Sequence, residues 1–277
     1  MKILPFQIPK PSNTAVLFQV DKGKLYGEFH QHEELQISLV QKGKGTIIVA
    51  DTVHHFTAGD VFVIGGQQPH VFRNEDDALL HTIFFSPESF GTAFLDLEEG
   101  KGIGDFYAFA KAGFKTSATP DITALFDHLS RAKGIHKLSY FIQLLSILKV
   151  ATHKPLSSFV YEKKITERDG KKMNAILTYT LSHFREAIQL QSVASVASMS
   201  PNAFCKYFKK RTNKTYFTFV TELRIEHACK LLRENPEMPI AIISEASGFL
   251  TLSHFNRKFK SLKAVSPREY RATFNSL

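Results

Sequence analysis

The sequence is poor in cysteine and has no long apolar run, and each scarcity excludes a class of protein. Only Cys205 and Cys229 occur among 277 residues, and neither belongs to a CxxC pair. This spacing argues against a disulfide framework and against a zinc finger. No run of eighteen apolar residues is present, and the first ten residues lack the pattern of a signal peptide. We therefore expect a cytoplasmic protein that does not insert into a membrane.

The first 170 residues have no excess of positive charge, since they contain 18 Lys and Arg against 19 Asp and Glu. Residues 171–277 contain 17 against 7, so the excess behind the net charge of +9 lies there. Clustered Lys and Arg gain affinity for phosphates by displacing counterions, which makes double-stranded DNA the expected partner. The alternative is a solvated basic face that binds no nucleic acid.

The N-terminal part predicts a β-rich fold. β-branched and aromatic residues alternate with turn signals, and the predicted strands span residues 37–40, 45–49, 61–64 and 81–85. Many short strands at regular spacing are typical of a sandwich or barrel. Apolar side chains then recur at helical spacing over residues 105–112, 121–132 and 137–152. We therefore expect an α+β domain over residues 1–153.

Residues 154–172 are polar and heavily charged, so we interpret them as a linker to a helical domain of residues 173–277. The helix before this linker has an apolar stripe that includes Phe141 and Leu145. Such a stripe most often packs on its own domain, but it can also mediate self-association. Because DNA recognition commonly uses two-fold symmetry, we expect a homodimer.

The helical domain contains an internal repeat. Six positions recur 51 residues later, namely Phe204, Phe208, Lys209, Asn213, Thr215 and Phe219 as Phe255, Phe259, Lys260, Ala264, Ser266 and Tyr270. Each copy predicts a short helix, a tight turn and a second helix, with Ser200 as a cap in the first copy and Gly248 at the turn of the second. A helix over residues 217–233 joins them and is long enough to hold the second helices about one turn of DNA apart. The pattern therefore predicts two linked helix-turn-helix units.

The second helix of each unit separates apolar from polar side chains. On a helical wheel, the side opposite the phenylalanines carries Asn202, Cys205, Lys206 and Lys209 in the first unit and Ser253, Asn256, Arg257 and Lys260 in the second. Arg and Lys pair with guanine, Asn pairs with adenine, and lysine suits phosphates. A polar face on one helix is most often only solvated, but two such faces at equivalent repeat positions favour DNA reading.

Several motifs of the helical domain match a known family. They are Gly248-Phe249, the segment SHFNRKFK from Ser253 to Lys260, Ser266-Pro267, Tyr270-Arg271, and Arg224, Ala228, Leu231 and Leu232 in the joining helix. With them, residues 173–271 closely resemble the AraC family of transcription regulators. The resemblance implies a sequence-specific regulator, an activator that works with RNA polymerase and is not an enzyme. The predicted DNA contacts are Ser200, Asn202, Cys205, Lys206, Lys209, Ser253, His254, Asn256, Arg257 and Lys260.

Two positions depart from the family pattern. Asn213 and Ala264 stand where the family commonly has a glycine after each recognition helix. Asn adopts a positive φ readily, whereas Ala costs about 1 kcal/mol there. We expect a local adjustment of the backbone and an unchanged fold.

Two segments of the N-terminal domain resemble the motifs of the cupin barrel, the first at His30-Gln31-His32 and the second between Gly59 and Asn74. In metal-binding cupins two His, a Glu and a last His hold a divalent ion, but here Gln36 replaces the Glu. The implied fold is a cupin-like β-barrel followed by helices. The predicted effector-binding residues are His30, His32, Gln36, His70 and Arg73.

Three interpretations of His30, His32 and His70 stay open. They line a pocket for a small-molecule effector without a cofactor, or hold Zn²⁺, Ni²⁺ or Fe²⁺ weakly, or fill the core. The favoured interpretation is an effector-responsive regulator in which a ligand in the barrel shifts the arrangement of domains or dimer halves. The alternatives are a metal-dependent cupin enzyme fused to a DNA-binding module and a constitutive regulator with a filled barrel.

Overall fold

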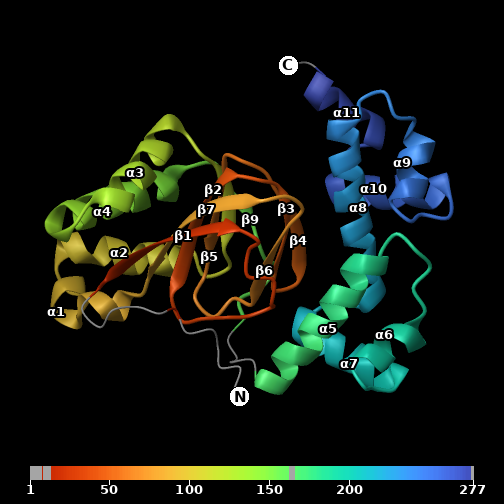
Figure 1. Ribbon diagram of the computed structural model, residues 1–277, viewed down its shortest axis with the longest axis horizontal. Helices are drawn as coiled ribbons and strands as arrows, with labels where there is room; N and C mark the ends of the chain where they lie inside the picture. Colours follow the sequence, from red (N-terminus) through yellow and green to blue (C-terminus); the bar gives the residue numbers. More distant parts are fainter. Residues whose placement is uncertain (1–7, 9–13, 162–165, 276–277) are drawn as a thin grey trace. The chain divides into compact units, whose positions relative to one another are not determined.

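The structure, a computed structural model, describes residue 8 and residues 14–161 and 166–275. The chain divides into two compact units, one of residues 1–50 and 56–170 and the other of residues 51–55 and 171–277. The predicted α+β multidomain fold is confirmed, because a β-rich barrel precedes an all-helical region (Figure 1). No helix in the described part of the chain is long and apolar enough to cross a membrane.

Two antiparallel sheets form the barrel. The larger has the strand order β1-β7-β2-β5-β8-β9, and the smaller has the order β4-β3-β6. The four predicted strands lie in β2, β3, β5 and β7. The complete set is β1 (Val16–Gly23), β2 (Leu35–Lys42), β3 (Gly45–Val49), β4 (Thr52–Phe56), β5 (Asp60–Ile64), β6 (His70–Asn74), β7 (Ala78–Phe85), β8 (Phe114–Ser117) and β9 (Lys154–Pro155).

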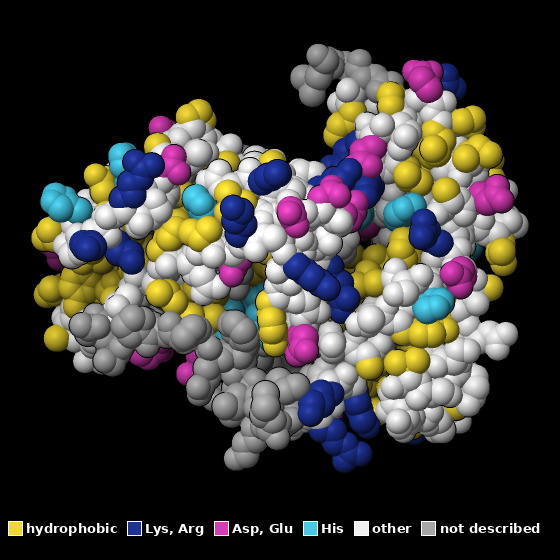
Figure 2. Space-filling view, in the orientation of Figure 1, with side chains coloured by type: hydrophobic (Ala, Val, Ile, Leu, Met, Phe, Trp, Pro, Cys, Tyr) yellow, Lys and Arg dark blue, Asp and Glu magenta, His cyan; other side chains and the backbone are white. Residues whose placement is uncertain are grey.

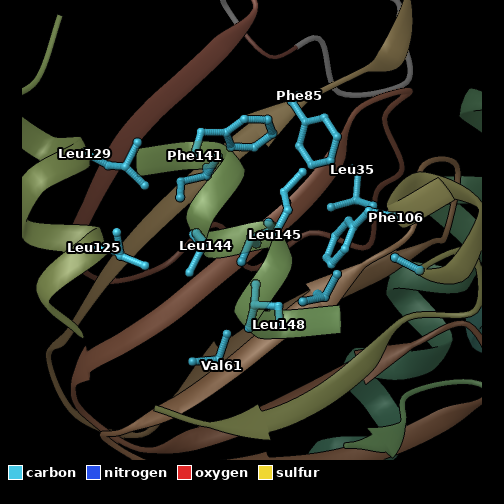
Figure 3. Packing of buried hydrophobic residues seen from close by; sticks show 14 of the residues in the cluster. Leu35, Val61, Phe85, Phe106, Leu125, Leu129, Phe141, Leu144, Leu145 and Leu148 are labelled. Carbon is cyan, nitrogen blue, oxygen red and sulfur yellow. The ribbon is translucent and has the colours of Figure 1, made fainter. Parts of the chain in front are cut away.

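Strand β2 separates two cores because its side chains alternate between faces. Leu35 and Ile37 point toward the helices and join a cluster that includes Val61, Phe85, Phe106, Leu125, Phe141 and Leu148 (Figure 3). Val40 belongs to a second cluster inside the barrel, with Ile47, Phe62 and Phe72. Gln36 shares the face of Val40, so a polar side chain enters the barrel interior beside this apolar cluster.

The helices beside the larger sheet are η1 (Pro87–Phe90), α1 (Thr92–Leu95), α2 (Glu98–Phe109), α3 (Pro120–Arg131) and α4 (Gly134–Val150). Helix α3 lies within one residue of its predicted bounds because Thr119 caps it and Pro120 occupies its first turn. Helix α2 begins seven residues before its predicted start, since three glycines among its first seven residues weaken the helical signal. Phe141 and Leu145 of α4 pack in the unit's own core, so the predicted stripe is not a free dimer surface.

The helical region contains α5 (Glu167–His183), α6 (Leu190–Val196), α7 (Pro201–Thr212), α8 (Tyr216–Glu234), α9 (Ile240–Ala246), α10 (Leu252–Lys263) and α11 (Pro267–Asn275). The predicted joining helix is α8. Of the predicted linker, 154–172, residues 162–165 lie outside the described residues, while β9 and the first turns of α5 fall within its bounds. The linker and the domain limits therefore stay predictions.

Candidate functional site

Each helix-turn-helix unit is built on the phenylalanines of the repeat. In the first unit, the ring of Phe204 lies 5.1 Å from that of Tyr216 on α8. In the second unit, the rings of Phe255 and Phe259 lie 5.5 Å apart, and Phe259 meets Tyr270 of α11 edge to face. All three phenylalanines are fully buried. The repeat therefore marks equivalent positions in the cores of two similar units.

The turns and helix ends follow the predicted chemistry. Ser200 accepts a hydrogen bond from Ala203 N and Thr251 accepts one from His254 N, so each recognition helix has a side-chain cap. Asn213 and Ala264 both adopt the left-handed conformation, with φ of 55° and 62°. Both residues thus adopt the backbone conformation that glycine commonly has at this position in the family, and the fold is not rearranged.

Gly248 is needed at the turn of the second unit. Its φ is 84°, and a Cβ added there would lie 2.8 Å from the backbone of Arg185. Ser198 occupies the corresponding place in the first unit with a φ of 54°, which the sequence analysis did not foresee. The spacing could have predicted this turn residue, because Ser198 lies two residues after the end of α6, just as Gly248 lies two residues after the end of α9.

The polar faces of α7 and α10 are open to a ligand. The exposed predicted contacts are Ser200, Asn202, Cys205, Lys206, Lys209, Ser253, Asn256, Arg257 and Lys260. Among the described residues, no hydrogen bond or ion pair engages the side chains of Asn202, Lys206 or Arg257. These groups can therefore donate to base edges or phosphates without first breaking an internal bond.

His254 differs from the other predicted DNA contacts. Its ring is partly buried and lies edge to face with Phe249 at 5.6 Å. Burial and the nearby positive charges of Arg257 and Lys258 lower its pKa, which favours a neutral imidazole. His254 therefore offers a neutral donor or acceptor and supports the turn, whereas the surrounding positive charge comes from Arg257 and Lys258.

Three histidines meet at one end of the barrel interior. One ring nitrogen each of His30, His32 and His70 lies within 4.8 Å of the others. The Nδ1 atoms face the backbone carbonyls of Glu28, Glu34 and Gln68 at 2.8, 2.9 and 2.9 Å. A carbonyl oxygen only accepts, so each Nδ1 carries a proton and donates it. Burial lowers the pKa of all three, that of His30 to about 4, so the rings are neutral at pH 7 and each Nε2 presents a lone pair.

Gln36 lies against two of these lone pairs. Its Oε1 is 3.1 Å from His32 Nε2 and 3.0 Å from His70 Nε2. Three acceptors facing one another repel, so they need a cation or a set of donors among them. Turning the Gln36 amide by 180° would supply two donors, and its oxygen would then accept from Ser38, whose hydroxyl also meets Thr82. With the Gln36 oxygen toward the rings, the cluster is complementary to a positively polarised ligand. With the amide turned, Gln36 itself pairs with His32 and His70.

A cavity of about 50 Å³ opens beside this cluster. It brings together three of the predicted effector residues, His30, Gln36 and His70. His32 lies behind it in the cluster, and the structure does not bring Arg73 to it, because strand alternation puts Arg73 on the face of β6 opposite His70. The lining residues that the sequence analysis missed are Gln19, Asp21, Leu25, Tyr26, Phe72, Leu80, Thr82 and Phe84.

Asp21 and Gln19 add further polar groups to the lining of this cavity. Gln19 Nε2 donates to Asp21 Oδ1 at 2.6 Å. Burial raises the pKa of Asp21, and the hydrogen bond from Gln19 partly offsets this. The lining thus combines a carboxyl group with imidazoles and amides, which can orient a small polar ligand by hydrogen bonds.

Comparisons with known proteins match both parts of the chain. Residues 193–273 match the family model of a helix-turn-helix domain, and residues 16–85 match that of a cupin domain. The uncharacterized HTH-type transcriptional regulator YobQ of Bacillus subtilis (strain 168) is 34% identical over 112 residues, which cover 40% of this chain and 46% of that protein. This chain therefore spans less than half of that relative's length.

Two further comparisons extend over most of the chain. The HTH-type transcriptional activator RhaR of Cronobacter sakazakii is 23% identical over 255 residues, covering 90% of this chain and 88% of that protein. Among solved structures, ToxT from Vibrio cholerae O395 aligns over 95% of this chain and 99% of its own, with 13% identity and a TM-score of 0.40. The sequence similarity to RhaR thus includes both the barrel and the helical region.

Proposed function

The chain belongs to the AraC family of transcription regulators, and from this premise we propose that the histidine cavity of its cupin barrel is an effector site that controls DNA binding. The helical region is the DNA-binding part, and the excess positive charge of the chain lies in it. The alternative of a cupin enzyme is not favoured, because the named relatives are transcriptional regulators.

The observation that carries the effector proposal is a cavity in the barrel whose lining combines buried polar side chains with apolar ones. A constitutive regulator with a filled barrel would have no reason to keep Gln36, His70 and Thr82 buried beside an open space. At about 50 Å³ the cavity is well below the roughly 150 Å³ that holds a benzene molecule. The effector is therefore compact, or it enters with an outward movement of Tyr26, which is 45% exposed and lies against the ring of His30.

A metal ion is the second candidate for this site, and a specific observation favours it. The three imidazoles have the tautomer that metal-ligating histidines adopt, with the other ring nitrogen held by a backbone carbonyl. Neutral nitrogen ligands and one amide oxygen suit Zn²⁺, Ni²⁺ or Fe²⁺, although the set lacks an anion. His30, His32 and His70 would hold the ion with Gln36 beside them, and the bound charge would act as the signal.

Operator affinity of the full chain, with and without candidate ligands, tests the proposal. Each compound of a panel of small sugars and acids, and each of Zn²⁺, Ni²⁺ and Fe²⁺, is added to protein freed of metal with a chelator. We expect one class to change operator affinity about tenfold or more. His70→Gln removes this response, whereas the control His81→Gln keeps it, because His81 lies on β7 outside the cluster. Intact operator binding that no compound or metal alters would contradict the effector site.

Two partners and a location complete the proposal. Activation requires a contact with RNA polymerase, and a palindromic operator would recruit a homodimer. Because Phe141 and Leu145 of α4 pack in the chain's own core, the proposed dimer does not use this stripe. The proposed location is cytoplasmic, where an operator is accessible.

A further inference from the structure

Leu250 is an extra residue in the turn of the second helix-turn-helix unit. Before the turn the two units correspond with an offset of 50 residues, since Met199 N donates to Ala194 O and Phe249 N donates to Ser244 O. After the turn the offset is 51, because the caps are Ser200 and Thr251. The first unit therefore has no residue at the position of Leu250.

The side chain of Leu250 is held in solvent. It is 92% exposed, whereas Phe249 before it is buried in the core of the unit and Thr251 after it caps α10. These two anchors prevent Leu250 from turning inward. Leu252, the first residue of α10, is 42% exposed. Figure 2 shows hydrophobic side chains in yellow at the surface around α9, the helix that leads into this turn.

The two leucines flank the cap of a recognition helix. Ser253, Asn256 and Arg257 are exposed farther along the same helix, and the N-terminal residues of a recognition helix are those that approach base edges. Isolated leucines are ordinary on protein surfaces. A pair at the N-terminal end of α10, however, lies at the end of the recognition helix that approaches DNA. The occupant of the patch is therefore DNA, because the polar and cationic side chains around it recognise DNA.

The major groove offers one apolar group to such a patch, the C5-methyl of thymine. We propose that Leu250 and Leu252 contact thymine methyl groups, so that the second unit selects A·T pairs beside the bases met by Asn256 and Arg257. This inference rests on DNA recognition by the second unit. Since the first unit lacks the inserted leucine, the two units differ in their preference for thymine.

Replacement of thymine by deoxyuridine tests the proposal, because it removes only the methyl group and leaves base pairing intact. The full chain first selects its operator from a random pool of double-stranded DNA. Single thymine-to-deoxyuridine changes are then made throughout that operator, and Kd is measured for each. At one or two positions we expect affinity to fall about fourfold, the value of one buried methyl group. Leu250→Ala and Leu252→Ala should each lose the response at the position that its leucine contacts, and the double variant should lose it throughout.

Leu262→Ala is the matched control, because Leu262 is 43% exposed at the other end of α10. It should keep the full response to deoxyuridine. The proposal is overturned if no deoxyuridine change weakens binding, or if the full response persists in the double leucine variant. It is also overturned if Leu250→Ala binds DNA normally but fails to activate transcription, which would assign the patch to a protein partner. Failure to select any DNA would instead contradict the DNA-binding function itself.

Discussion

The two helix-turn-helix units have matching aromatic cores but reach their turns by different means. The second unit uses Gly248 at its left-handed turn residue, whereas the first uses Ser198. At the end of the recognition helix the order is reversed, since Asn213 of the first unit tolerates a positive φ better than Ala264 of the second. The buried phenylalanines thus determine the fold of each unit. Ser198 and Ala264 adopt a positive φ, although neither is glycine, because the packing of the core requires this backbone conformation at the turn.

The largest effect expected from this comparison concerns the cores. Phe255→Ala and Phe204→Ala each remove a fully buried ring, so each should lower the free energy of unfolding of the helical region by about 3–5 kcal/mol. Chemical denaturation of the full chain measures this. Phe217→Ala is the control, because Phe217 is 48% exposed on α8 and should change stability by less than about 1 kcal/mol. A loss confined to one of the two core variants would show that the units are not equivalent.

The next effect concerns DNA reading. Arg257→Ala and Lys206→Ala should each weaken specific operator binding by about 1–3 kcal/mol and nonspecific binding by less, because both side chains are placed to meet base edges. Binding to the operator and to unrelated DNA, measured at one salt concentration, separates the two effects. Lys149→Ala removes one exposed positive charge from α4 and should leave the ratio unchanged. Equal losses on both DNAs would reduce these residues to phosphate contacts.

The smallest effect concerns the helix ends. Ala264→Gly should stabilise the chain by about 1 kcal/mol, because glycine adopts a positive φ without strain. Asn213→Gly should gain less than half as much, since asparagine already suits that conformation. The control Ala241→Gly, in the exposed part of α9, should instead cost about 0.5–1 kcal/mol. An Ala264→Gly variant less stable than the native chain would show that a contact of the methyl group outweighs the strain.

The helical region was largely predictable because its signals are local. Caps such as Ser200, the spacing of phenylalanines and the positions of Gly248 and Asn213 act within one or two turns of helix. The joining helix, predicted over residues 217–233, extends only one residue farther at each end. The repeat pattern did not reveal the one-residue insertion at Leu250, because all six matched positions lie after the turn.

The cavity was only partly predictable because strand pairing creates it. The motif spacing identified His30, Gln36 and His70, but Gln19 and Thr82 meet only because β1 pairs with β7 in the register that places them side by side. No local pattern encodes that register. Arg73 shows the opposite error, since it neighbours Phe72 in the sequence and yet lies on the other face of β6.

Footprinting of the full chain on its selected operator tests the central claim most directly. If both units read DNA, protection should cover two successive segments of major groove on one face of the duplex, with centres about 10–10.5 base pairs apart. Lys206→Ala should weaken protection of one segment and Arg257→Ala that of the other. A single protected segment that both substitutions weaken alike would contradict the account of two tandem readers.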